Sequence, residues 1–286
     1  MESYRLEGQT FVIDDYDRKP AFSSFLPGLA GVKGIPLWTF YTNRGQGMNS
    51  FGIDNKGNAI MEFNSANTAF ENTQVKGFRT FLKIDGEYYE PFFTYEKEAK
   101  RQMRMNKNSF KIIETNEKYG IEVTVNYYVL PNESIGALVR QVSVKNIGDS
   151  AKEVQVIDGL PKIITYGIAN GEFKEMSNLF KSWADIRNLE NKVPYYTLRA
   201  STKDSAEVSD VEGGYYYLTV RDGKLQDVIY DVDTVFGYDL SLMTPVNFID
   251  GSIEGVLSKE QCFANKVPCG FTPFKEVVEP GKELAF

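Results

Sequence analysis

GIEVTVNYYVL at residues 120–130 and ALVRQVSV at residues 137–144 are the two stretches that decide the fold class. Apolar side chains occupy every second position from Ile121 to Tyr127, and successive side chains of a strand point to opposite faces of its sheet. β-branched and aromatic residues also favour strands. Both stretches are therefore predicted to be half-buried antiparallel strands.

The same alternation recurs along the rest of the chain, punctuated by turn pairs such as Asp85-Gly86 and Asp222-Gly223. So many short strands with hardly a helix between them exclude a doubly wound α/β fold. They predict an all-β fold, a large antiparallel β-sandwich. Further strands are expected at residues 10–13, 35–41, 59–63, 78–84, 88–94, 110–114, 153–157, 195–200, 215–220, 228–232 and 275–278.

One amphipathic helix is expected to interrupt the strands. In residues 171–189 the apolar side chains from Phe173 to Leu189 recur every three or four positions, as one face of a helix requires. This spacing predicts a helix over about residues 171–190, of about five turns. We expect its apolar stripe, which includes Trp183, to be core or a docking face rather than a cofactor site.

Composition narrows the function classes. The chain has 286 residues, of which 42% are hydrophobic, so it can bury a large core as one domain. A net charge of -7 argues against a nucleic-acid or anionic-membrane partner, because both need a positive field. Histidine is absent, so the Ser-His and Cys-His nucleophile pairs cannot form. The only thiols are Cys262 and Cys269, and two cysteines without histidine predict neither a metal site nor a cofactor.

The two ends of the chain give further expectations. The amino-terminal sequence MESYRLEGQTFVIDD has an acidic residue at position 2 and no apolar core typical of a secretion signal. No stretch approaches the roughly 20 apolar residues that cross a bilayer, so a cytoplasmic location is expected. A second alternating segment begins at Lys282 and the sequence stops at Phe286, which suggests a β-sandwich domain over residues 1–286 that is incomplete at its C-terminal end.

The region around Trp38 is the best candidate for a ligand site. A planar aromatic ring beside amides and a guanidinium suits a saccharide, which offers a C–H face to stack and hydroxyls to bond. The alternative is a turn whose polar groups satisfy the backbone. The candidate substrate-binding residues are Trp38, Tyr41, Asn43, Arg44 and Gln46, next to glycines 45 and 47, and Asn49, Asn64 and Asn67 follow them.

Other motifs carry less weight. Gly45-Gln46-Gly47 lacks the third glycine and the βαβ unit of a nucleotide site. Carboxylates on turns and helix faces are usually solvated. The acid/base candidates considered on that basis are Asp14, Asp15, Asp158, Glu172 and Asp185, and none is assigned as catalytic.

Several long motifs resemble the amino-terminal domain of β-1,2-oligoglucan phosphorylases, which belong to glycoside hydrolase family 94. The family also contains the phosphorylase-like module of cyclic β-1,2-glucan synthases, and cellobiose and chitobiose phosphorylases. The motifs are PGLAGVKGIPLWTFYTNRGQG at 27–47, FRTFLKI at 78–84, DGLPKIITYG at 158–167, VPYYTLRASTKDSAEVSDVEGG at 193–214 and ANKVPCGFTPF at 264–274.

The resemblance implies a super-β-sandwich followed by a helical linker, an (α/α)6 catalytic barrel and a small jelly roll. It implies inverting phosphorolysis of β-1,2-glucooligosaccharides, with inorganic phosphate as co-substrate and α-glucose 1-phosphate as product. Phosphate brings its own nucleophilic oxygen, so one acidic side chain suffices. The general-acid Asp of the family lies in the barrel and matches no residue of this sequence, so we expect the chain alone to be inactive.

Three readings of the chain's role follow. In the first it is an accessory domain that supports the barrel and lines the rim of the substrate cleft with Arg44 and Gln46, with Trp38 or Tyr41 behind them. In the second it is a self-sufficient carbohydrate-binding module, or the phosphorylase-like module of a cyclic glucan synthase. In the third it is chiefly an assembly surface, for the barrel and for a homodimer.

Overall fold

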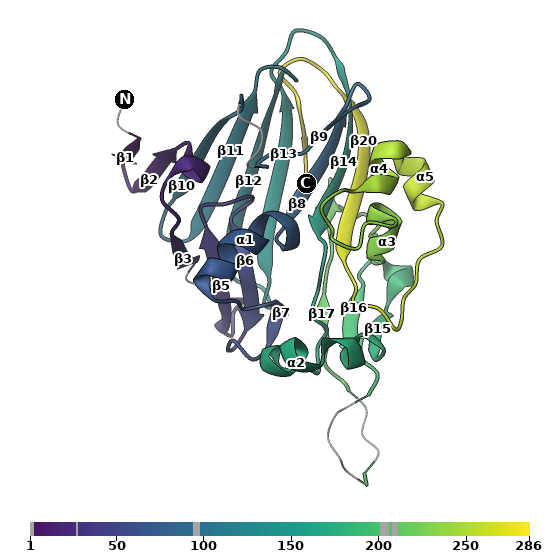
Figure 1. Cartoon of the computed structure of the whole chain (residues 1–286). Helices are drawn as coiled ribbons and strands as arrows, with labels where there is room; N and C mark the ends of the chain where they lie inside the picture. The colour runs from purple at the N-terminus through teal and green to yellow at the C-terminus, as the bar shows by residue number, and fades with distance from the viewer. Residues whose placement is uncertain (1–2, 27, 94–97, 201–205, 208–210) are drawn as a thin grey trace.

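The computed structural model describes residues 3–26, 28–93, 98–200, 206–207 and 211–286, and most of their regular structure is antiparallel β-sheet (Figure 1). The largest sheet has seven strands in the order β1-β2-β10-β11-β12-β13-β21. Its strands are β1 Tyr4–Glu7, β2 Thr10–Asp14, β10 Lys100–Met105, β11 Ser109–Asn116, β12 Ile121–Val129, β13 Leu138–Asn146 and β21 Glu283–Ala285. The two deciding stretches are thus neighbours, paired from Ile121↔Asn146 to Val129↔Leu138.

A four-stranded sheet in the order β20-β14-β8-β9 packs face to face on the seven-stranded one. Buried Val123 and Val125 of β12 belong to the same core cluster as Leu82 and Val156 of the smaller sheet. Its strands are β8 Arg79–Ile84, β9 Glu87–Tyr89, β14 Lys152–Leu160 and β20 Gly270–Val278. The all-β class and the antiparallel sandwich predicted from the sequence are confirmed.

Smaller sheets extend one end of the sandwich. A five-stranded sheet has the order β3-β5-β6-β7, with β4 also paired to β5, and contributes to the main core through Tyr41 and Met48. Its strands are β3 Ser23–Leu26, β4 Leu29–Ala30, β5 Ile35–Thr42, β6 Met48–Ile53 and β7 Ala59–Met61. The others are β15 Ala184–Arg187, β16 Tyr195–Leu198, β17 Tyr215–Tyr216, β18 Val220–Arg221 and β19 Lys224–Leu225.

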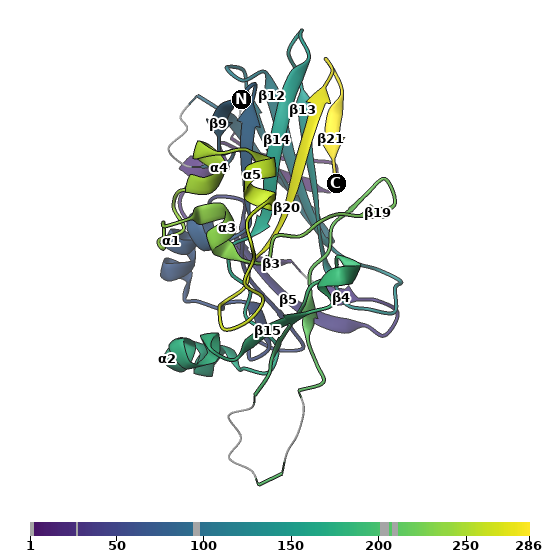
Figure 2. The same cartoon turned by 90° about the vertical axis from the view of Figure 1, so that its right-hand side faces the viewer.

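Short helices cover the outer face of the four-stranded sheet (Figure 2). Phe236 and Phe248 of these helices pack on Phe81 and Phe271 of the sheet in a second core cluster. The helices here are α3 Val232–Phe236, α4 Val246–Asp250 and α5 Ile253–Leu257; elsewhere lie α1 Ala66–Lys76, α2 Asn170–Lys181 and the 3-10 turns η1 Tyr16–Arg18 and η2 Leu189–Asn191. No helix in the described part of the chain is both long and apolar enough to cross a membrane.

The helix predicted over residues 171–190 is correct through Lys181 and wrong beyond it. Residues 184–187 form β15 and pair with β16, and η2 follows. Ala184 and Ile186 are buried by strand alternation, so the same apolar residues satisfy a period of two once a partner strand is present. Tertiary pairing therefore overrode the local helical spacing.

The remaining differences are local. Residues 228–232 were expected to be a strand, but they hold an isolated bridge between Ile229 and Phe271 before α3 begins. Helices α1 and α3 to α5 were not expected. The alternating segment after Lys282 is the strand β21, whose Leu284 is buried against β13. The strand predicted at 88–94 ends at Tyr89, and the one predicted at 215–220 is interrupted between Tyr216 and Val220. Residue 94, residue 27 of the motif at 27–47 and part of the motif at 193–214 lie outside the described residues.

Candidate functional site

Strand β5 positions Trp38, and its alternation decides which of its side chains reach the surface. Trp38 is 40% exposed, whereas Leu37 and Thr39 on either side are buried. The indole Nε1 donates a hydrogen bond of 2.9 Å to the carbonyl oxygen of Asp54. This bond fixes the edge of the ring and leaves the ring itself at the surface.

Tyr41 and Asn43 point into the molecule instead. The Tyr41 ring stacks on Phe110 at a centroid distance of 4.5 Å, and burial raises the pKa of its phenol. The fully buried Asn43 donates from Nδ2 to the Tyr16 carbonyl at 2.8 Å and accepts at Oδ1 from the backbone N–H of Phe22 at 2.9 Å. Its amide therefore holds the neighbouring loop and is not available to a ligand.

Arg44 and Gln46 are also engaged within the protein. Arg44 donates to the carbonyl oxygens of Asn43 at 2.8 Å and Lys19 at 3.2 Å, which are the contacts expected of a loop-capping arginine. Gln46 is buried and donates from Nε2 to Thr80 Oγ1 at 3.0 Å, and its Oε1 accepts from Arg140. Of the five candidates in the sequence, only Trp38 is exposed at the surface, and the structure does not bring the five together.

Aromatic rings continue outward from Trp38 across the five-stranded sheet. Trp38 stacks on Phe40 at 6.5 Å, Phe25 lies 6.3 Å from Phe40, and Phe63 meets Phe40 edge-on at 5.8 Å. These four residues form what we call the aromatic strip. Trp38, Phe40 and Phe25 line an open groove of about 740 Å³ together with Leu29 and other apolar residues.

A polar hollow of about 420 Å³ adjoins the strip at Phe40. We call it the amide hollow, because Asn49 and Asn64 project into it beside the rings of Phe40 and Phe63. Its lining is completed by Ser23, Ser50, Lys56, Ala66, Ala69 and Asn170. From the sequence, aromatic rings and amides were expected to meet between Trp38 and Gln46. In the structure, rings and amides meet instead on the outer surface of the five-stranded sheet, where the amides are those of Asn49 and Asn64.

Helix α2 forms one wall of the amide hollow. The backbone N–H of Phe63 donates to Asn170 Oδ1 at 3.0 Å, and Lys174 Nζ donates to the Phe63 carbonyl. Helix α1 begins at Ala66 on another side. The wall is therefore built by segments that are about 100 residues apart in sequence, as the contact between positions 63 and 170 shows.

The side chain of Asn49, which lines the hollow, has a hydrogen-bond donor that is not used. Its Nδ2 is shielded from solvent and has no hydrogen-bond partner among the described residues. A buried donor without an acceptor is destabilising by about 1–3 kcal/mol.

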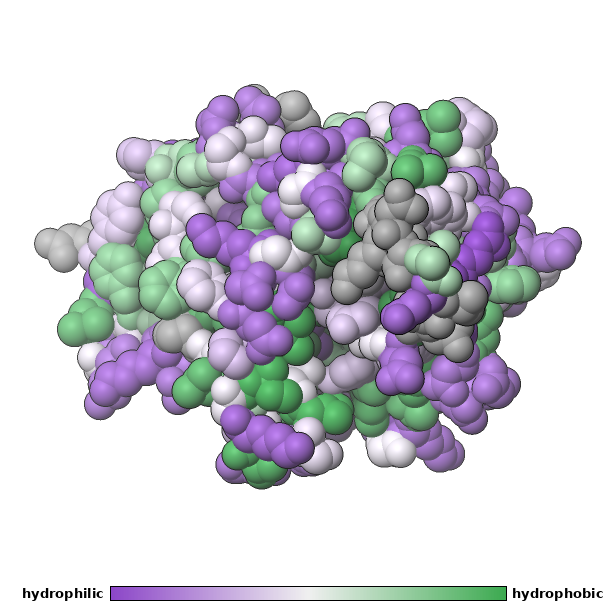
Figure 3. All heavy atoms as spheres, turned by 90° about the horizontal axis from the view of Figure 1, so that it is seen from below, coloured by the Kyte–Doolittle hydropathy of each residue, from purple (hydrophilic) through white to green (hydrophobic). Residues whose placement is uncertain are grey.

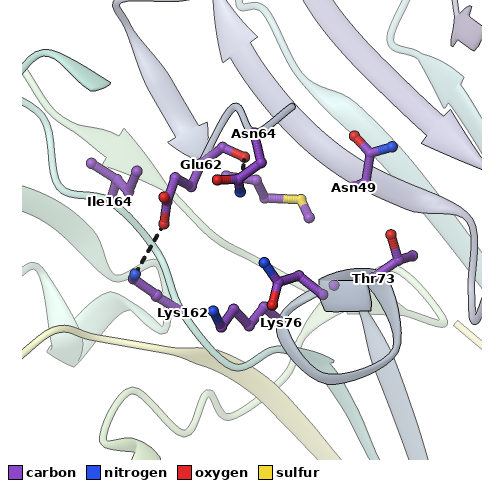
Figure 4. A pocket seen from close by; sticks show the side chains of 10 residues that line it. Asn49, Glu62, Asn64, Thr73, Lys76, Lys162 and Ile164 are labelled. Carbon is purple, nitrogen blue, oxygen red and sulfur yellow. Dashed lines mark hydrogen bonds and ion pairs between the residues drawn. The ribbon is translucent and has the colours of Figure 1, made fainter. Parts of the chain in front are cut away.

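Asn49 and Asn64 also line a second, much smaller hollow of about 20 Å³, which we call the lysine hollow (Figure 4). Lys162 Nζ lies 3.3 Å from a carboxylate oxygen of Glu62 and 4.5 Å from the centroid of the Phe173 ring. Burial lowers the pKa of Lys162, Glu62 opposes that effect, and the charges of Lys76 and Lys181 lower it further. This end of the depression thus holds two lysines, Lys76 and Lys162, of which Lys162 is paired with Glu62.

Most of the carboxylates considered as acid/base candidates from the sequence form ion pairs or hydrogen bonds within the protein. Asp158 pairs with Arg140 at 2.7 Å inside the sandwich, and Asp185 pairs with Arg187 at 2.8 Å. Asp14 accepts from Gln102 at 2.8 Å, and Glu172 accepts from the backbone N–H of Ala169 at 3.2 Å. Asp15 adopts a left-handed conformation before η1. The five do not gather into one site.

Within the described residues, no group of three or more His, Cys, Asp or Glu side chains is arranged to hold a metal ion. Asn49 and Asn64 were noted in the sequence but not singled out, and Lys76 and Lys162 were missed. Nothing in the sequence could have selected them, because their proximity arises from the packing of α1, β6, β7 and the segment after β14. No protein-family model matches the chain, and a search of curated proteins finds no significant match.

Proposed function

We propose that this chain is an accessory, saccharide-binding β-sandwich of an inverting glycoside phosphorylase that acts on β-1,2-glucooligosaccharides. The observation that carries the proposal is the amide hollow joined to the aromatic strip. Phe40 and Trp38 offer ring faces to the C–H face of a sugar, and Asn49 and Asn64 offer amides to its hydroxyls. The antiparallel sandwich and the five sequence motifs support the assignment to a phosphorylase.

In this proposal the catalytic step belongs to the (α/α)6 barrel, and the sandwich presents the oligosaccharide and supports the barrel. Inorganic phosphate is the co-substrate of the parent enzyme, and no resident cofactor is needed. The chain alone is expected to release no α-glucose 1-phosphate from β-1,2-glucooligosaccharides and phosphate. Turnover by the purified chain would contradict this part of the proposal.

Saccharide binding can be followed through tryptophan fluorescence, because the chain has only two tryptophans. Trp38 belongs to the strip, whereas Trp183 is not one of its four residues and packs on Phe180 at 5.7 Å. Titration with β-1,2-glucooligosaccharides should change the emission of the wild type and of Trp183→Phe. Trp38→Ala should bind roughly three- to tenfold more weakly, since aromatic stacking contributes about 0.5–1.5 kcal/mol.

A matched control separates stacking from general apolar contact. Leu29 lines the same groove and is 69% exposed, but it has no ring. Leu29→Ala should leave saccharide affinity within about twofold of the wild type. If calorimetry finds no saccharide binding by the wild type, or equal losses in Leu29→Ala and Trp38→Ala, then the strip does not bind sugars.

A second role is favoured by the apolar character of the groove beyond Trp38. Phe25, Leu29 and Val32 are 60%, 69% and 67% exposed, and clusters of exposed apolar residues mark contact surfaces. Figure 3 looks at this end of the molecule and shows apolar side chains among polar ones. We propose that the groove also contacts the barrel, or a second copy of the chain. Sedimentation of Leu29→Asp beside the wild type tests whether it mediates self-association.

A further inference from the structure

The amide hollow and the lysine hollow are parts of one depression. Asn49 and Asn64 line both of them, so a ligand in the amide hollow would have the lysine hollow as its neighbour. Figure 4 shows Asn64 between Glu62 and Asn49, with Lys76 and Lys162 on the same side of the depression. The site therefore has a ring-and-amide part and a charged part.

The charged part is cationic in a protein that is otherwise acidic. Three lysines, Lys56, Lys76 and Lys162, line the two hollows, and among the described residues Glu62 is the only carboxylate in their lining. The whole chain carries a net charge of -7. A local excess of lysine against that background attracts anions, because the nearby field outweighs distant charges that salt screens.

The charges are also incompletely paired. Glu62 and Lys162 have side chains that are 23% and 27% exposed, and they lie at 3.3 Å, so this pair neutralises only one lysine. Lys76 ends helix α1 at the rim, and no hydrogen bond or ion pair engages its ammonium group in the described chain. The exposed ammonium group of Lys76 is therefore a positive charge of the depression that has no counter-ion among the described residues.

We infer that this depression selects a saccharide bearing an anionic group, a carboxylate or a phosphate ester. Its neutral ring would lie against Phe40 and Phe63 and its hydroxyls on Asn49 and Asn64. Its anionic group would lie at the mouth of the lysine hollow beside Lys76 and Lys162, because the hollow itself has room for about one water molecule. This inference deepens the proposed function and rests on it. It adds a charge preference that a site for neutral glucan alone does not need.

The test compares ligands of matched size by calorimetry: glucose, glucuronate, glucose 6-phosphate and inorganic phosphate, with a neutral β-1,2-glucooligosaccharide as reference. At low salt at least one of the two anionic sugars should bind about tenfold more tightly than glucose, and which of them does so identifies the anionic group. The preference should shrink in 1 M NaCl, where charges are screened within about 3 Å. Equal affinity for glucose and both anionic sugars would overturn the inference.

Lysine variants test which residues produce the preference for anionic sugars. Lys76→Met should remove most of the tenfold preference, measured as the ratio of the affinities for the preferred anionic sugar and for glucose. Lys259→Met, an exposed lysine after α5, is the matched control and should change neither. Lys162→Met is a second probe, used only if its melting temperature stays close to the wild type, because it leaves Glu62 without its partner.

The two proposals fail in different ways. Loss of binding to every saccharide, charged or neutral, contradicts the proposed function itself. Binding of the neutral oligosaccharide with no preference for the anionic sugars contradicts only the inference. A preference that survives Lys76→Met and Lys162→Met alike places the anion elsewhere and also overturns it.

Discussion

Replacing Asp158 tests whether the polar cluster around Gln46 is a structural core or part of a ligand site. Asp158 and Arg140 lie between the sheets with side chains 6% and 7% exposed. Arg140 Nη2 donates to Asp158 Oδ1 at 2.7 Å and its Nε donates to Oδ2 at 3.1 Å. Thr80 Oγ1 donates to the same carboxylate at 2.6 Å. Asp158→Ala removes all of these acceptors and leaves the guanidinium buried.

The expected loss is large. Removing one partner of a buried ion pair costs about 3–5 kcal/mol, because the remaining charge stays desolvated. With an unfolding entropy of about 2.1 cal/mol/K per residue, a chain of 286 residues has about 0.6 kcal/mol/K. Asp158→Ala should therefore lower the melting temperature by roughly 5–8 °C.

The assay is differential scanning calorimetry of three proteins. Glu117→Ala is the control, since its carboxylate is 74% exposed and lies 2.6 Å from Lys100 Nζ, and an exposed pair contributes at most about 1 kcal/mol. The double variant Arg140→Met with Asp158→Leu should recover much of the loss, because apolar replacement of a buried pair is often neutral. If Asp158→Ala melts within about 1 °C of Glu117→Ala, the cluster is not a buried structural network and Gln46 returns as a ligand candidate.

Two further predictions concern packing and thiol chemistry. A Cβ on Gly159, where φ is +154°, would lie 1.9 Å from the carbonyl oxygen of Gly270. Gly159→Ala should therefore lower the free energy of unfolding, measured in urea, by at least about 3 kcal/mol. Gly171→Ala in α2 is the control: a Cβ there meets nothing within 4 Å, so the variant should lower the free energy of unfolding by less than about 0.5 kcal/mol or raise it. Cys269 is buried, and burial raises the pKa of its thiol, whereas Cys262 is exposed. A thiol reagent should therefore modify one cysteine per chain rapidly in the native protein and two in denaturant. Rapid modification of both cysteines in the native state would show that β20 opens easily.

The sequence determined the strands and their class. Ile121, Val123, Val125 and Tyr127 alternate with more polar residues, so a slip of one residue would expose them, and both deciding stretches form antiparallel strands as predicted. These features are local, since a period of two follows from the geometry of one strand.

Tertiary structure decided the rest. Residues 184–187 became a strand because β16 offered hydrogen bonds, although their spacing also fits a helix. Asn43 and Gln46 have the chemistry of sugar ligands, yet Tyr16, Thr80 and Arg140 occupy their amides inside the fold. Conversely, Lys162 is distant along the chain from Asn49, Asn64 and Lys76. The four share a depression because α1 packs on β6 and the segment after β14 bonds to β7 through Ile164 N–H and the Ile60 carbonyl. A residue's chemistry can be read from sequence, but whether that chemistry is free for a ligand depends on partners that only packing supplies.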